Sequence, residues 1–579
     1  MTISPAAPAT APAPALWSRC PGCASIVYVP RLARTRGVCP ECDHHHRLCA
    51  DERLRTLVDD GSFVAAPRVR GGDPLGFTDS LPYGERLARA RERTGLDDAV
   101  LHGTATIGGH RVVVAVMDFS FLGGSMGSAV GEAVTRSCER ALSERVPLVL
   151  AVASGGARMQ EGCLSLMQMG KTAQAMRRLR GAGVLSVCVL TDPTFGGVTA
   201  SFATLGDVLI AERGALVGFA GPRVIASATR EKLPPGFQSA EYLAERGMLD
   251  RVEPREGLRP LLARLLSTTG RPGNEQTGNA PHRDVRNGNG SAQGTPLPAR
   301  SAAVIRDPGE LSGAPAARET LRLARDTRRP TTLDYIWHLC SDFVELHGDR
   351  THGDDPAIVG GTGLLDGTPV MIIGHQKGHD TGELVARNFG LAHPEGYRKA
   401  LRLMRLADRL GLPVVTLVDT QGAAPGVGAE DRGQSWAIAE CLAGMSELSV
   451  PVVATVVGEG GSGGALALAL ANRVLMLRHA VYSVISPESC SAILYGDPSH
   501  ATELAGSLRI TAPELLRLGV VDGVVPEPAG GAQEDPRAAM DALRSAVLES
   551  LRELSGLDGD ELRKHRHERF RVLGVVEDE

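Results

Sequence analysis

Long apolar runs alternate with stretches of helical periodicity along the chain. The runs 146–153 and 184–190 are apolar almost throughout, which is typical of parallel strands covered on both faces. Between them, apolar positions follow helical spacing over residues 164–180, and each run is followed by a glycine-rich turn. Alternation of buried strands with helices predicts an α/β fold built on parallel sheet.

The C-terminal half repeats this succession in the same register. V-P-L-V-L-A-V-A-S-G-G, which ends at Gly156, matches L-P-V-V-T-L-V-D-T-Q-G, which ends at Gly422. Forty-one residues after these two glycines come Gly197 and Gly463, so the offset stays at 266 residues. The later segments D-V-L-I-A and R-V-L-M-L continue the match. A register held over such a length indicates a duplicated domain.

Shifts in composition divide the chain into five expected segments. Residues 1–16 are rich in Ala and Pro and have neither a basic region nor a long apolar core, so we expect a disordered leader rather than a signal peptide. A stretch rich in Gly, Asn and Pro at 269–317 predicts a flexible linker. As a coil of about 45 residues it would reach ~35–40 Å, which leaves open whether the halves pair within one chain or between two. The other segments are a small module at 17–50 and two domains at 51–268 and 318–579.

Charge and cysteine content narrow the class of protein. The 579 residues include 62 Lys and Arg against 67 Asp and Glu, a formal net charge of -5. This balance argues against binding of nucleic acid or of an anionic membrane over a broad surface. No apolar run is long and uncharged enough to predict a membrane span. Eleven cysteines without a secretion signal predict a reducing compartment, and we expect a cytoplasmic location.

Four cysteines near the N-terminus have the spacing of a zinc ribbon. Cys20, Cys23, Cys39 and Cys42 form the pattern C-x2-C-x15-C-x2-C. Each pair fits a tight turn in which two thiolates bind one ion, and the intervening run is long enough for a short hairpin. A pair of redox dithiols is the weaker alternative, because both pairs have ribbon spacing. Four thiolates fill the tetrahedral shell of Zn2+, so one structural zinc ion per chain is expected.

The glycine-rich turns are the candidate catalytic groups. A turn that leads from a strand into a helix leaves backbone N–H groups unpaired, and two converging N–H donors form an oxyanion hole for a thioester enolate or a ureido oxygen. Ordinary turn geometry and close packing of small residues are the alternatives, and no phosphate-binding loop or dinucleotide fingerprint is present. The duplication favours two facing holes and a reaction with two carbonyl-like partners. The candidate residues are Gly155, Gly156, Gly196, Gly197, Gly422, Gly463 and Gly464.

At these turns the sequence resembles the carboxyltransferase subunits of bacterial acetyl-CoA carboxylase. Residues 17 to about 265 resemble the zinc-bearing β subunit in V-C-P-E-C-D-H-H, F-L-G-G-S-M-G-S, A-S-G-G-A-R-M-Q-E and G-F-A-G-P-R-V-I. Residues from about 318 to 575 resemble the α subunit in D-F-V-E-L-H-G-D-R, H-P-E-G-Y-R-K-A-L-R-L-M, G-V-G-A-E and G-E-G-G-S-G-G-A-L. The matches occur in the family order and cover most of the chain.

The resemblance implies a crotonase-type ββα superhelix in each half and a carboxyltransferase reaction. Carboxybiotin on a separate carrier protein would meet acetyl-CoA in a cleft and yield malonyl-CoA. The turn at Gly155 and Gly156 would stabilise the acyl-CoA enolate, and the turn at Gly463 and Gly464 would hold the ureido oxygen of biotin. Biotin itself would take the α-proton after CO2 is released, which agrees with the lack of a Ser-His-Asp, Cys-His or paired-carboxylate signature. The protein would contribute proximity and electrostatic stabilisation.

Two β-like motifs also imply contacts with coenzyme A. They are F-L-G-G-S and G-F-A-G-P-R, and an arginine follows the first oxyanion turn. Arg158, Arg223 and Lys377 are candidates for binding the CoA phosphates, with surface or turn-fixing roles as the alternative. The expected cofactor-binding residues are Gly123, Gly124, Arg158, Phe219, Gly221 and Arg223.

Partners follow from what the sequence does not contain. It has no A-M-K-M-like biotinylation site and no recognisable ATP-binding carboxylase module, so we expect a separate biotin carrier protein and a biotin carboxylase. Because the family forms its cleft across a dimer, the resemblance also implies a homodimer of the fused chain. Its malonyl-CoA would serve fatty-acid biosynthesis or a secondary pathway, with no membrane or nucleic-acid partner.

Three departures from the family pattern bear on specificity and activity. Gln421 and Ala424 stand where the α subunit usually has proline and tyrosine, Ser489 replaces a turn glycine, and the charged helical hairpin that usually opens the α subunit is almost absent. A carboxyltransferase for another short acyl-CoA, such as propionyl-CoA, therefore remains open. So does a degenerate subunit that regulates or binds RNA. A hydratase, isomerase or decarboxylase on the same fold is a further alternative, although no Glu or Asp pair is evident for it.

Overall fold

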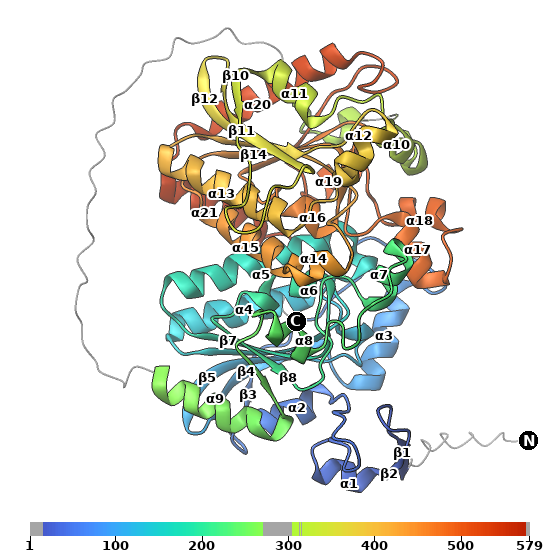
Figure 1. Ribbon diagram of the computed structural model, residues 1–579, viewed down its shortest axis with the longest axis vertical. Helices are drawn as coiled ribbons and strands as arrows, with labels where there is room; N and C mark the ends of the chain where they lie inside the picture. The colour runs from blue at the N-terminus through green and yellow to red at the C-terminus, as the bar shows by residue number, and fades with distance from the viewer. Residues whose placement is uncertain (1–15, 270–303, 312, 314, 575–579) are drawn as a thin grey trace, which may run out of the picture.

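Two α/β halves are stacked on one another, and a small module precedes them (Figure 1). The structure is a computed structural model and describes residues 16–269, 304–311, 313 and 315–574. The expected leader, apart from Leu16, and most of the expected linker lie outside the described residues.

The N-terminal module is a two-stranded hairpin followed by a short helix. Strand β1 (Trp17–Arg19) pairs antiparallel with β2 (Ile26–Tyr28), and α1 (Val29–Arg34) begins directly after it. The run between the two cysteine pairs therefore contains a strand and a helix rather than a hairpin of its own. Pro30 explains the difference, because proline favours the first turn of a helix.

The N-terminal half is a seven-stranded sheet covered by helices. Its first three strands are antiparallel and the later ones parallel, as helical crossovers require. The expected strands at 146–153 and 184–190 and the expected helix at 164–180 are confirmed as β6, β7 and α5. The strands are β3 (Val64–Ala65), β4 (Val100–Ile107), β5 (His110–Met117), β6 (Leu148–Ser154), β7 (Ser186–Thr194), β8 (Val208–Glu212) and β9 (Arg251–Glu253). The helices are α2 (Ala50–Leu57), α3 (Tyr83–Thr94), α4 (Ser128–Glu144), α5 (Gly162–Gly181), α6 (Gly196–Thr199), α7 (Pro222–Thr229), α8 (Ala240–Glu245) and α9 (Arg255–Thr269).

The C-terminal half has the same architecture in an eight-stranded sheet. The strands are β10 (Cys340–Glu345), β11 (Ile358–Leu365), β12 (Thr368–His375), β13 (Val414–Thr420), β14 (Val452–Gly461), β15 (Arg473–Leu477), β16 (Val481–Ser483) and β17 (Gly523–Val525). The helices are α10 (Ala317–Ala324), α11 (Thr332–Leu339), α12 (Thr381–Ala386), α13 (Pro394–Leu410), α14 (Val427–Asp431), α15 (Gln434–Glu447), α16 (Ser462–Leu466), α17 (Pro487–Tyr495), α18 (Ala501–Ser507), α19 (Ala512–Arg517), α20 (Pro536–Leu554) and α21 (Gly559–Arg571).

The duplication predicted from the sequence is visible in the fold. Strands β6 and β13 are related by the 266-residue offset, and each one runs parallel to the strand that follows it in the sequence. Each of these strands ends in a glycine-rich turn, and α6 and α16 begin at the second turn of their half. Both pairs of turns therefore lie at the carboxyl edge of parallel strands, where open α/β sheets usually bind ligands.

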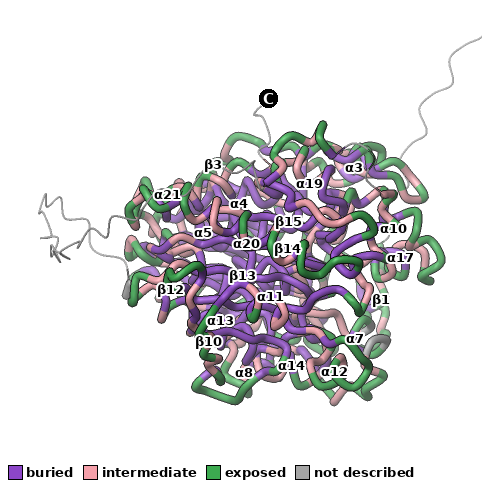
Figure 2. Tube along the Cα trace, turned by 90° about the horizontal axis from the view of Figure 1, so that it is seen from above, coloured by how far each residue is buried: buried purple, intermediate pink, exposed green. Residues whose placement is uncertain are grey.

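Helix α5 forms the seam between the two halves. Nearly all of its residues are buried, because it packs against α4 and β7 in its own half and against α15, α16 and α21 of the C-terminal half. Buried segments consequently run without interruption through the middle of the molecule, while the exposed ones lie at its periphery (Figure 2). In the structure, then, the two halves of one chain pair with each other.

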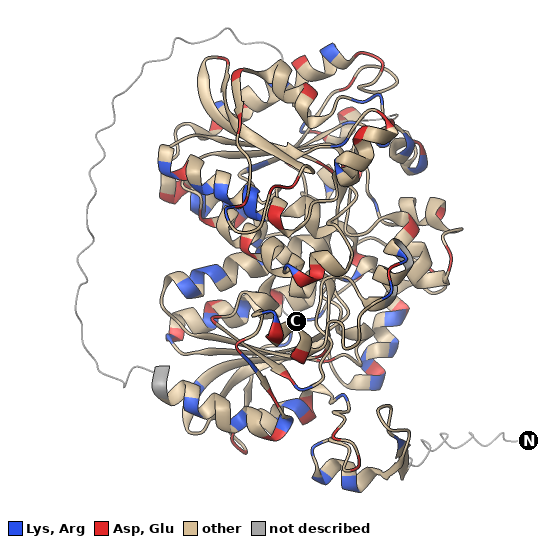
Figure 3. Cartoon of the chain, viewed as in Figure 1, with Lys and Arg blue, Asp and Glu red and all other residues tan. Residues whose placement is uncertain are grey.

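Polar contacts reinforce this apolar seam. The Arg571 guanidinium on α21 contacts Glu132 at 2.7 Å and Glu139 at 2.9 Å on α4. The side-chain amide of Gln168 donates to the carbonyl oxygen of Leu573 at 3.1 Å. Elsewhere Lys and Arg positions are interspersed with Asp and Glu positions along the ribbon of both halves (Figure 3). Within the described ranges, no helix is both long and apolar enough to cross a membrane.

Candidate functional site

The four predicted cysteine ligands come together in the N-terminal module. All four Sγ atoms lie within 4.8 Å of one another, with 3.7 Å between Cys20 and Cys42 and 3.9 Å between Cys23 and Cys39. Tetrahedral Zn–S bonds of about 2.3 Å place the sulfur atoms about 3.8 Å apart. The thiolate cage therefore fits a zinc ion that has four protein ligands and no open position for catalysis.

A buried carboxylate attaches this module to the N-terminal half. Glu212, at the end of β8, accepts hydrogen bonds from Arg53 at 2.6 Å and from Arg255 at 2.7 Å. Arg255 in turn donates to the backbone carbonyls of Arg36 and His46, at 2.6 and 2.8 Å. The position of the cysteine module is thus set by hydrogen bonds to the N-terminal half as well as by its own fold.

Most of the predicted oxyanion glycines in the N-terminal half already use their N–H groups. Gly155 donates to the Gly123 carbonyl at 2.8 Å, Gly156 donates to the Ser154 hydroxyl at 3.0 Å, and Gly196 donates to the Phe219 carbonyl at 2.9 Å. These three glycines shape the two turns and offer no free donor.

Gly197 is the one of the four predicted glycines of this half whose N–H has no partner among the described residues. It lies in the first turn of α6, where no intrahelical carbonyl can pair with its N–H. A Cβ added at Gly197 would lie 3.2 Å from the Cβ of Ala157, so the two turns approach closely here. Ala157 lies in a parallel bridge with Met126, in which the hydrogen bonds are made by the Gly156 carbonyl and the Arg158 N–H. The N–H of Ala157 itself has no partner among the described residues. Ala157 and Gly197 therefore form the candidate oxyanion hole, and sequence reasoning missed Ala157.

The C-terminal half repeats this arrangement. Gly422 donates to the Thr420 hydroxyl at 3.1 Å, as Gly156 does to Ser154. Gly463 and Gly464 lie in the first turn of α16, and a Cβ added at Gly464 would lie 2.7 Å from the backbone N of Ala423. Ala423 and the start of α16 therefore form the second candidate hole. Ala157 and Ala423, the two missed residues, lie at the same repeat position, 266 residues apart, but alanine gives no sequence signal of a free N–H group.

One side chain of α5 lies between the two holes. A Cβ added at Gly197 would lie 3.0 Å from Met169 Sδ, and one added at Gly463 would lie 2.8 Å from Met169 Cε. Met169 is buried, with 1% of its surface exposed. The structure thus brings the predicted turns of the two halves into contact with one buried methionine within a single chain.

The residues expected to bind CoA through their backbones mostly build the first hole. The Gly123 and Phe219 carbonyls hold Gly155 and Gly196, as described above. Gly124 has φ +62° and lies so close to the Ala153 carbonyl that a Cβ would come within 2.1 Å of it. Gly221 caps α7, and the side chain of Arg223 lies outside the described part of the structure.

Two of the cations expected at CoA phosphates are committed elsewhere. Arg158 is fully buried and donates to Asp98 at 2.6 and 3.0 Å and to the Ser125 carbonyl at 2.7 Å. Lys377 lies 2.8 Å from Asp419 and 2.9 Å from Glu459 in the C-terminal half. Burial lowers the pKa of Lys377, but the two carboxylates raise it by more, so that the net pKa lies above its ordinary value. The ammonium therefore stays charged and paired. The phosphate-binding interpretation is wrong for Arg158, whose buried guanidinium fixes the turn, whereas for Lys377, which lines a cavity, it stays a prediction.

A cavity of about 150 Å³ lies beside the second hole. Its lining includes Lys377, Asp419, Gln421 and Glu459 together with Phe389. Gln421 is exposed at the start of the turn, where the α subunit usually has proline. Gln421 therefore contributes to the lining of the cavity beside the second hole.

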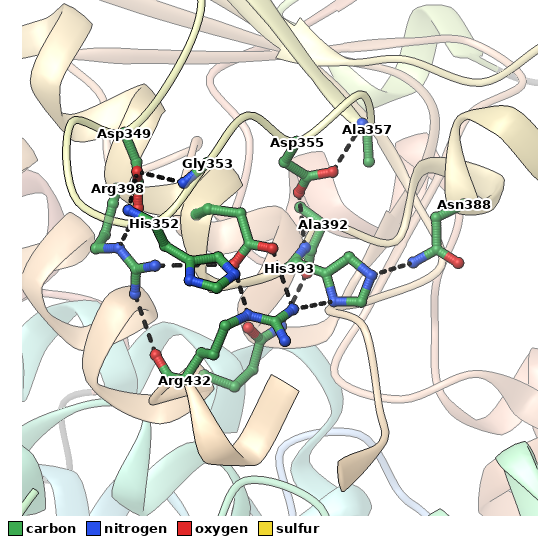
Figure 4. A network of polar contacts seen from close by, with 12 residues as sticks. Asp349, His352, Gly353, Asp355, Ala357, Asn388, Ala392, His393, Arg398 and Arg432 are labelled. Carbon is green, nitrogen blue, oxygen red and sulfur yellow. Dashed lines mark hydrogen bonds and ion pairs between the residues drawn. The ribbon is translucent and has the colours of Figure 1, made fainter. Parts of the chain in front are cut away.

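A network of charged side chains lies next to the segment that is hydrogen-bonded to the second hole (Figure 4). The Arg432 guanidinium contacts both Glu395 oxygens at 3.1 Å and lies 3.4 Å from Nδ1 of His393. The backbone N–H of His393 donates to Asp355 at 2.7 Å. Directly before His393, the Ala392 carbonyl accepts the N–H of Ala424 at 2.9 Å. The network thus holds the strand segment on which the turn at Ala423 depends.

Three known protein families match successive parts of the chain. Residues 17–42 match the acetyl-CoA carboxylase zinc finger domain, residues 44–235 match the carboxyl transferase domain, and residues 314–574 match the acetyl co-enzyme A carboxylase carboxyltransferase-like family. These three matches have the order and positions of the module and the two halves.

Individual relatives match over nearly the whole chain. A protein of Salinispora arenicola described as acetyl-coenzyme A carboxylase carboxyl transferase subunits beta/alpha is 57% identical, covering 97% of this chain and 96% of its own length. A protein of Clostridium tetani with the same description is 42% identical, covering 96% and 93%. The subunit alpha of Thermus thermophilus is 57% identical over 44% of this chain and 81% of its own. Among solved structures, transcarboxylase 12S aligns with a TM-score of 0.34 at 22% identity, covering 91% of this chain and 92% of its own.

Proposed function

The chain belongs to the acetyl-CoA carboxylase carboxyltransferase family, with β-like and α-like halves joined, and we propose that it transfers a carboxyl group from carboxybiotin on a separate carrier protein to acetyl-CoA. The product is malonyl-CoA. The observation that carries the proposal is that one turn from each half, each with candidate N–H donors, meets the same buried residue, Met169, within one chain. Such an arrangement suits a reaction in which two substrates each place one carbonyl oxygen in a hole.

On the CoA side, the N–H groups of Ala157 and Gly197 receive the thioester oxygen. Removal of a proton from the acetyl methyl group places negative charge on that oxygen, and fixed N–H donors stabilise this charge without having to reorganise. Glycine at 197 is required because a methyl group would press on Met169 and Ala157.

On the biotin side, the turn at Ala423 and Gly463 receives the ureido oxygen. The N–CO2 bond of carboxybiotin breaks to give CO2 and a ureido anion, and the oxygen carries part of the resulting charge. The ureido nitrogen then takes the methyl proton of acetyl-CoA, and the enolate carbon attacks CO2 to form the new C–C bond. No side chain of this chain has to act as a base, in agreement with the buried, paired state of Asp419 and Glu459.

The remaining parts of the proposal concern the surroundings of the enzyme. A biotin carrier protein and a biotin carboxylase would supply carboxybiotin, and the fused chain would work in the cytoplasm as a homodimer to make malonyl-CoA for fatty-acid biosynthesis. Near-complete coverage of relatives described as carboxyl transferase subunits supports the need for such partners. Light scattering would test the homodimer, whose mass is expected to be twice the 60.9 kDa of one chain.

A carboxyltransferase for another short acyl-CoA is the second candidate function. It is favoured by Gln421 and by Ala424, which is small and buried where the family usually has tyrosine. Less bulk at this turn, which lies on the biotin side, leaves more room in the site that the turns of the two halves share.

An exchange assay separates these functions. Purified chain would be incubated with biotin and with malonyl-, methylmalonyl- or ethylmalonyl-CoA, and release of acetyl-, propionyl- or butyryl-CoA would be measured. Fastest exchange with malonyl-CoA supports the main proposal, whereas faster exchange with a larger substrate supports the second. Absence of exchange with all three would contradict both and favour a regulatory or RNA-binding subunit.

A further inference from the structure

Helix α14 lies at the seam and is linked to both oxyanion holes. It belongs to the C-terminal half, yet it lies against the loop that precedes α7 in the N-terminal half (Figure 1). Its sequence, V-G-A-E-D, follows the second oxyanion turn directly. Neither the zinc module nor the exchange chemistry above uses this helix.

Glu430 of α14 connects the helix to the CoA-side hole. Its carboxylate accepts the N–H of Phe219 at 2.9 Å and the N–H of Ala220 at 2.8 Å. The carbonyl of the same Phe219 holds the N–H of Gly196 at 2.9 Å, and Gly197 is the next residue. Three covalent or hydrogen-bonded steps therefore separate the carboxylate from the donor of the hole.

Arg432, just beyond α14, connects the same segment to the biotin-side hole. It contacts Glu395 and His393 in the network of Figure 4. That network ends at Ala392, which pairs with the turn at Ala423 and Ala424. The segment from 427 to 432 is thus hydrogen-bonded toward one hole at Glu430 and toward the other at Arg432.

The surroundings of Glu430 are unusual for a carboxylate. Only 3% of the residue is exposed, and no Lys or Arg in the described chain lies within ion-pair distance of it. A buried charge without a counterion costs stability, so it is poorly explained as a device to hold the seam together. Burial also raises its pKa to about 7, against the effect of the Phe219 and Ala220 N–H groups and of the Gln238 side chain.

We propose that Glu430 is a positioning residue that sets the CoA-side oxyanion hole in register with the biotin-side hole across the seam. The inference rests on the proposed carboxyltransferase function. The carboxylate touches neither substrate. It holds the Phe219 loop so that the Gly197 N–H stays aimed at the thioester oxygen while Arg432 holds the opposite turn.

A matched pair of substitutions tests the role of Glu430. Glu430→Gln keeps the shape of the side chain but turns one acceptor into a donor that faces an N–H. Asp431→Asn is the control, because Asp431 also crosses the seam, to Tyr242 and Arg246, without touching the Phe219 loop.

The kinetic readout is malonyl-CoA/biotin exchange. Glu430→Gln is expected to lower kcat on the order of tenfold to a hundredfold while KM for malonyl-CoA and for biotin changes much less, because a displaced hole affects the transition state more than substrate binding. Asp431→Asn is expected to stay near the wild-type rate. A wild-type kcat in Glu430→Gln, or an equal loss in Asp431→Asn, overturns the inference.

A second readout does not depend on activity. Amide hydrogen exchange over residues 195–200 and 218–221 is expected to be faster in Glu430→Gln than in the wild type and unchanged in Asp431→Asn. If the wild type showed no carboxyl exchange, the proposed function would fail, and this measurement would still decide whether Glu430 holds the turn. Unchanged protection in Glu430→Gln overturns the inference.

Discussion

At the scale of single residues, glycine has two separate tasks in this site. Gly155, Gly156 and Gly196 use their N–H groups to close the turns, whereas Gly197 keeps its own free. Gly156 needs its φ of +122°, a conformation that side chains disfavour, while Gly197 needs empty space beside Met169. A glycine-rich motif therefore identifies the location of an oxyanion hole better than it identifies the donor.

Glu430 makes a pH-dependent contribution to stability. Its pKa is about 7 in the folded chain, against an ordinary value of 4.5, so the folded state keeps a proton that the unfolded state releases between these values. Relative to Glu430→Gln, wild-type stability should fall as pH rises from about 4.5 to 7, by about 3 kcal/mol in all, and level off above pH 7. Urea midpoints of both proteins at several pH values would measure this.

The groups facing Glu430 do not change the sign of this effect. Asp431 on its own helix raises the pKa of Glu430 further, and Tyr242 on α8 stays neutral because burial and Asp431 raise its pKa to about 12. A constant difference in urea midpoint across this range would contradict a raised pKa.

Sequence reasoning reached the residue scale only where partners are close in the chain. The zinc cysteines were found because each pair lies within one tight turn and the pairs flank a short run. Arg158 was misassigned because its partner, Asp98, is 60 residues away. Glu430 was not singled out because its partner Phe219 lies 211 residues away in the other half. Periodicity and spacing carry no information on such contacts.

At the scale of elements, burial pattern decided what could be predicted. Strands β6 and β7 and helix α5 were predicted because covered strands are apolar throughout and helices keep their period. The seam between the halves could not be predicted, because an apolar face on α5 does not reveal which helices will cover it. The packing of α5 against α15, α16 and α21 is a result of the tertiary fold.

The zinc module should be separable from the catalytic halves. Cys23→Ser removes one of four ligands, and the expected result is loss of zinc from one ion per chain to almost none. Because a bound zinc ion would crosslink the small module through four thiolates, residues 16–48 should become sensitive to protease while the two halves remain resistant. Metal analysis and limited proteolysis check this, with Cys49→Ser as the control. Retention of zinc in Cys23→Ser would contradict the predicted ligand set.

Helix α21 should contribute to the seam through Arg571. Its partner Glu132 is 1% exposed, so Arg571→Ala removes one of the cations around a buried carboxylate. We expect the free energy of unfolding to fall by about 2–3 kcal/mol. This is less than the loss expected if Glu132 kept no cation at all, because Lys171 still pairs with it. Arg563→Ala on the same helix is the control, since its pair with Asp560 is exposed and worth little. Equal thermal stability of the two variants would contradict this role.

At the scale of the whole molecule, one fused chain brings both candidate holes together. The covalent linker sets the ratio of the halves at one to one, and the sequence left open which halves would pair. In the structure they pair within the chain across α5, so one chain contains every element proposed for transfer.

Cleavage of the linker should therefore leave a working enzyme. A protease site introduced between residues 270 and 303 would separate the halves covalently, while the apolar seam and the Arg571 contacts remain. The nicked protein is expected to elute as one species on size exclusion and to keep its exchange activity. Dissociation into two fragments on cutting would contradict a stable seam.

Complementation between two inactive chains tests the central claim most directly. Gly197→Ala and Gly463→Ala chains with different tags would be produced separately and together, and malonyl-CoA/biotin exchange would be measured for the wild type, each variant and the doubly purified mixture. If one chain builds a complete site, the wild type is active, each variant is strongly impaired and the mixture recovers nothing, because every chain has one blocked hole. Recovery of activity in the mixture, or absence of exchange in the wild type, would contradict the account.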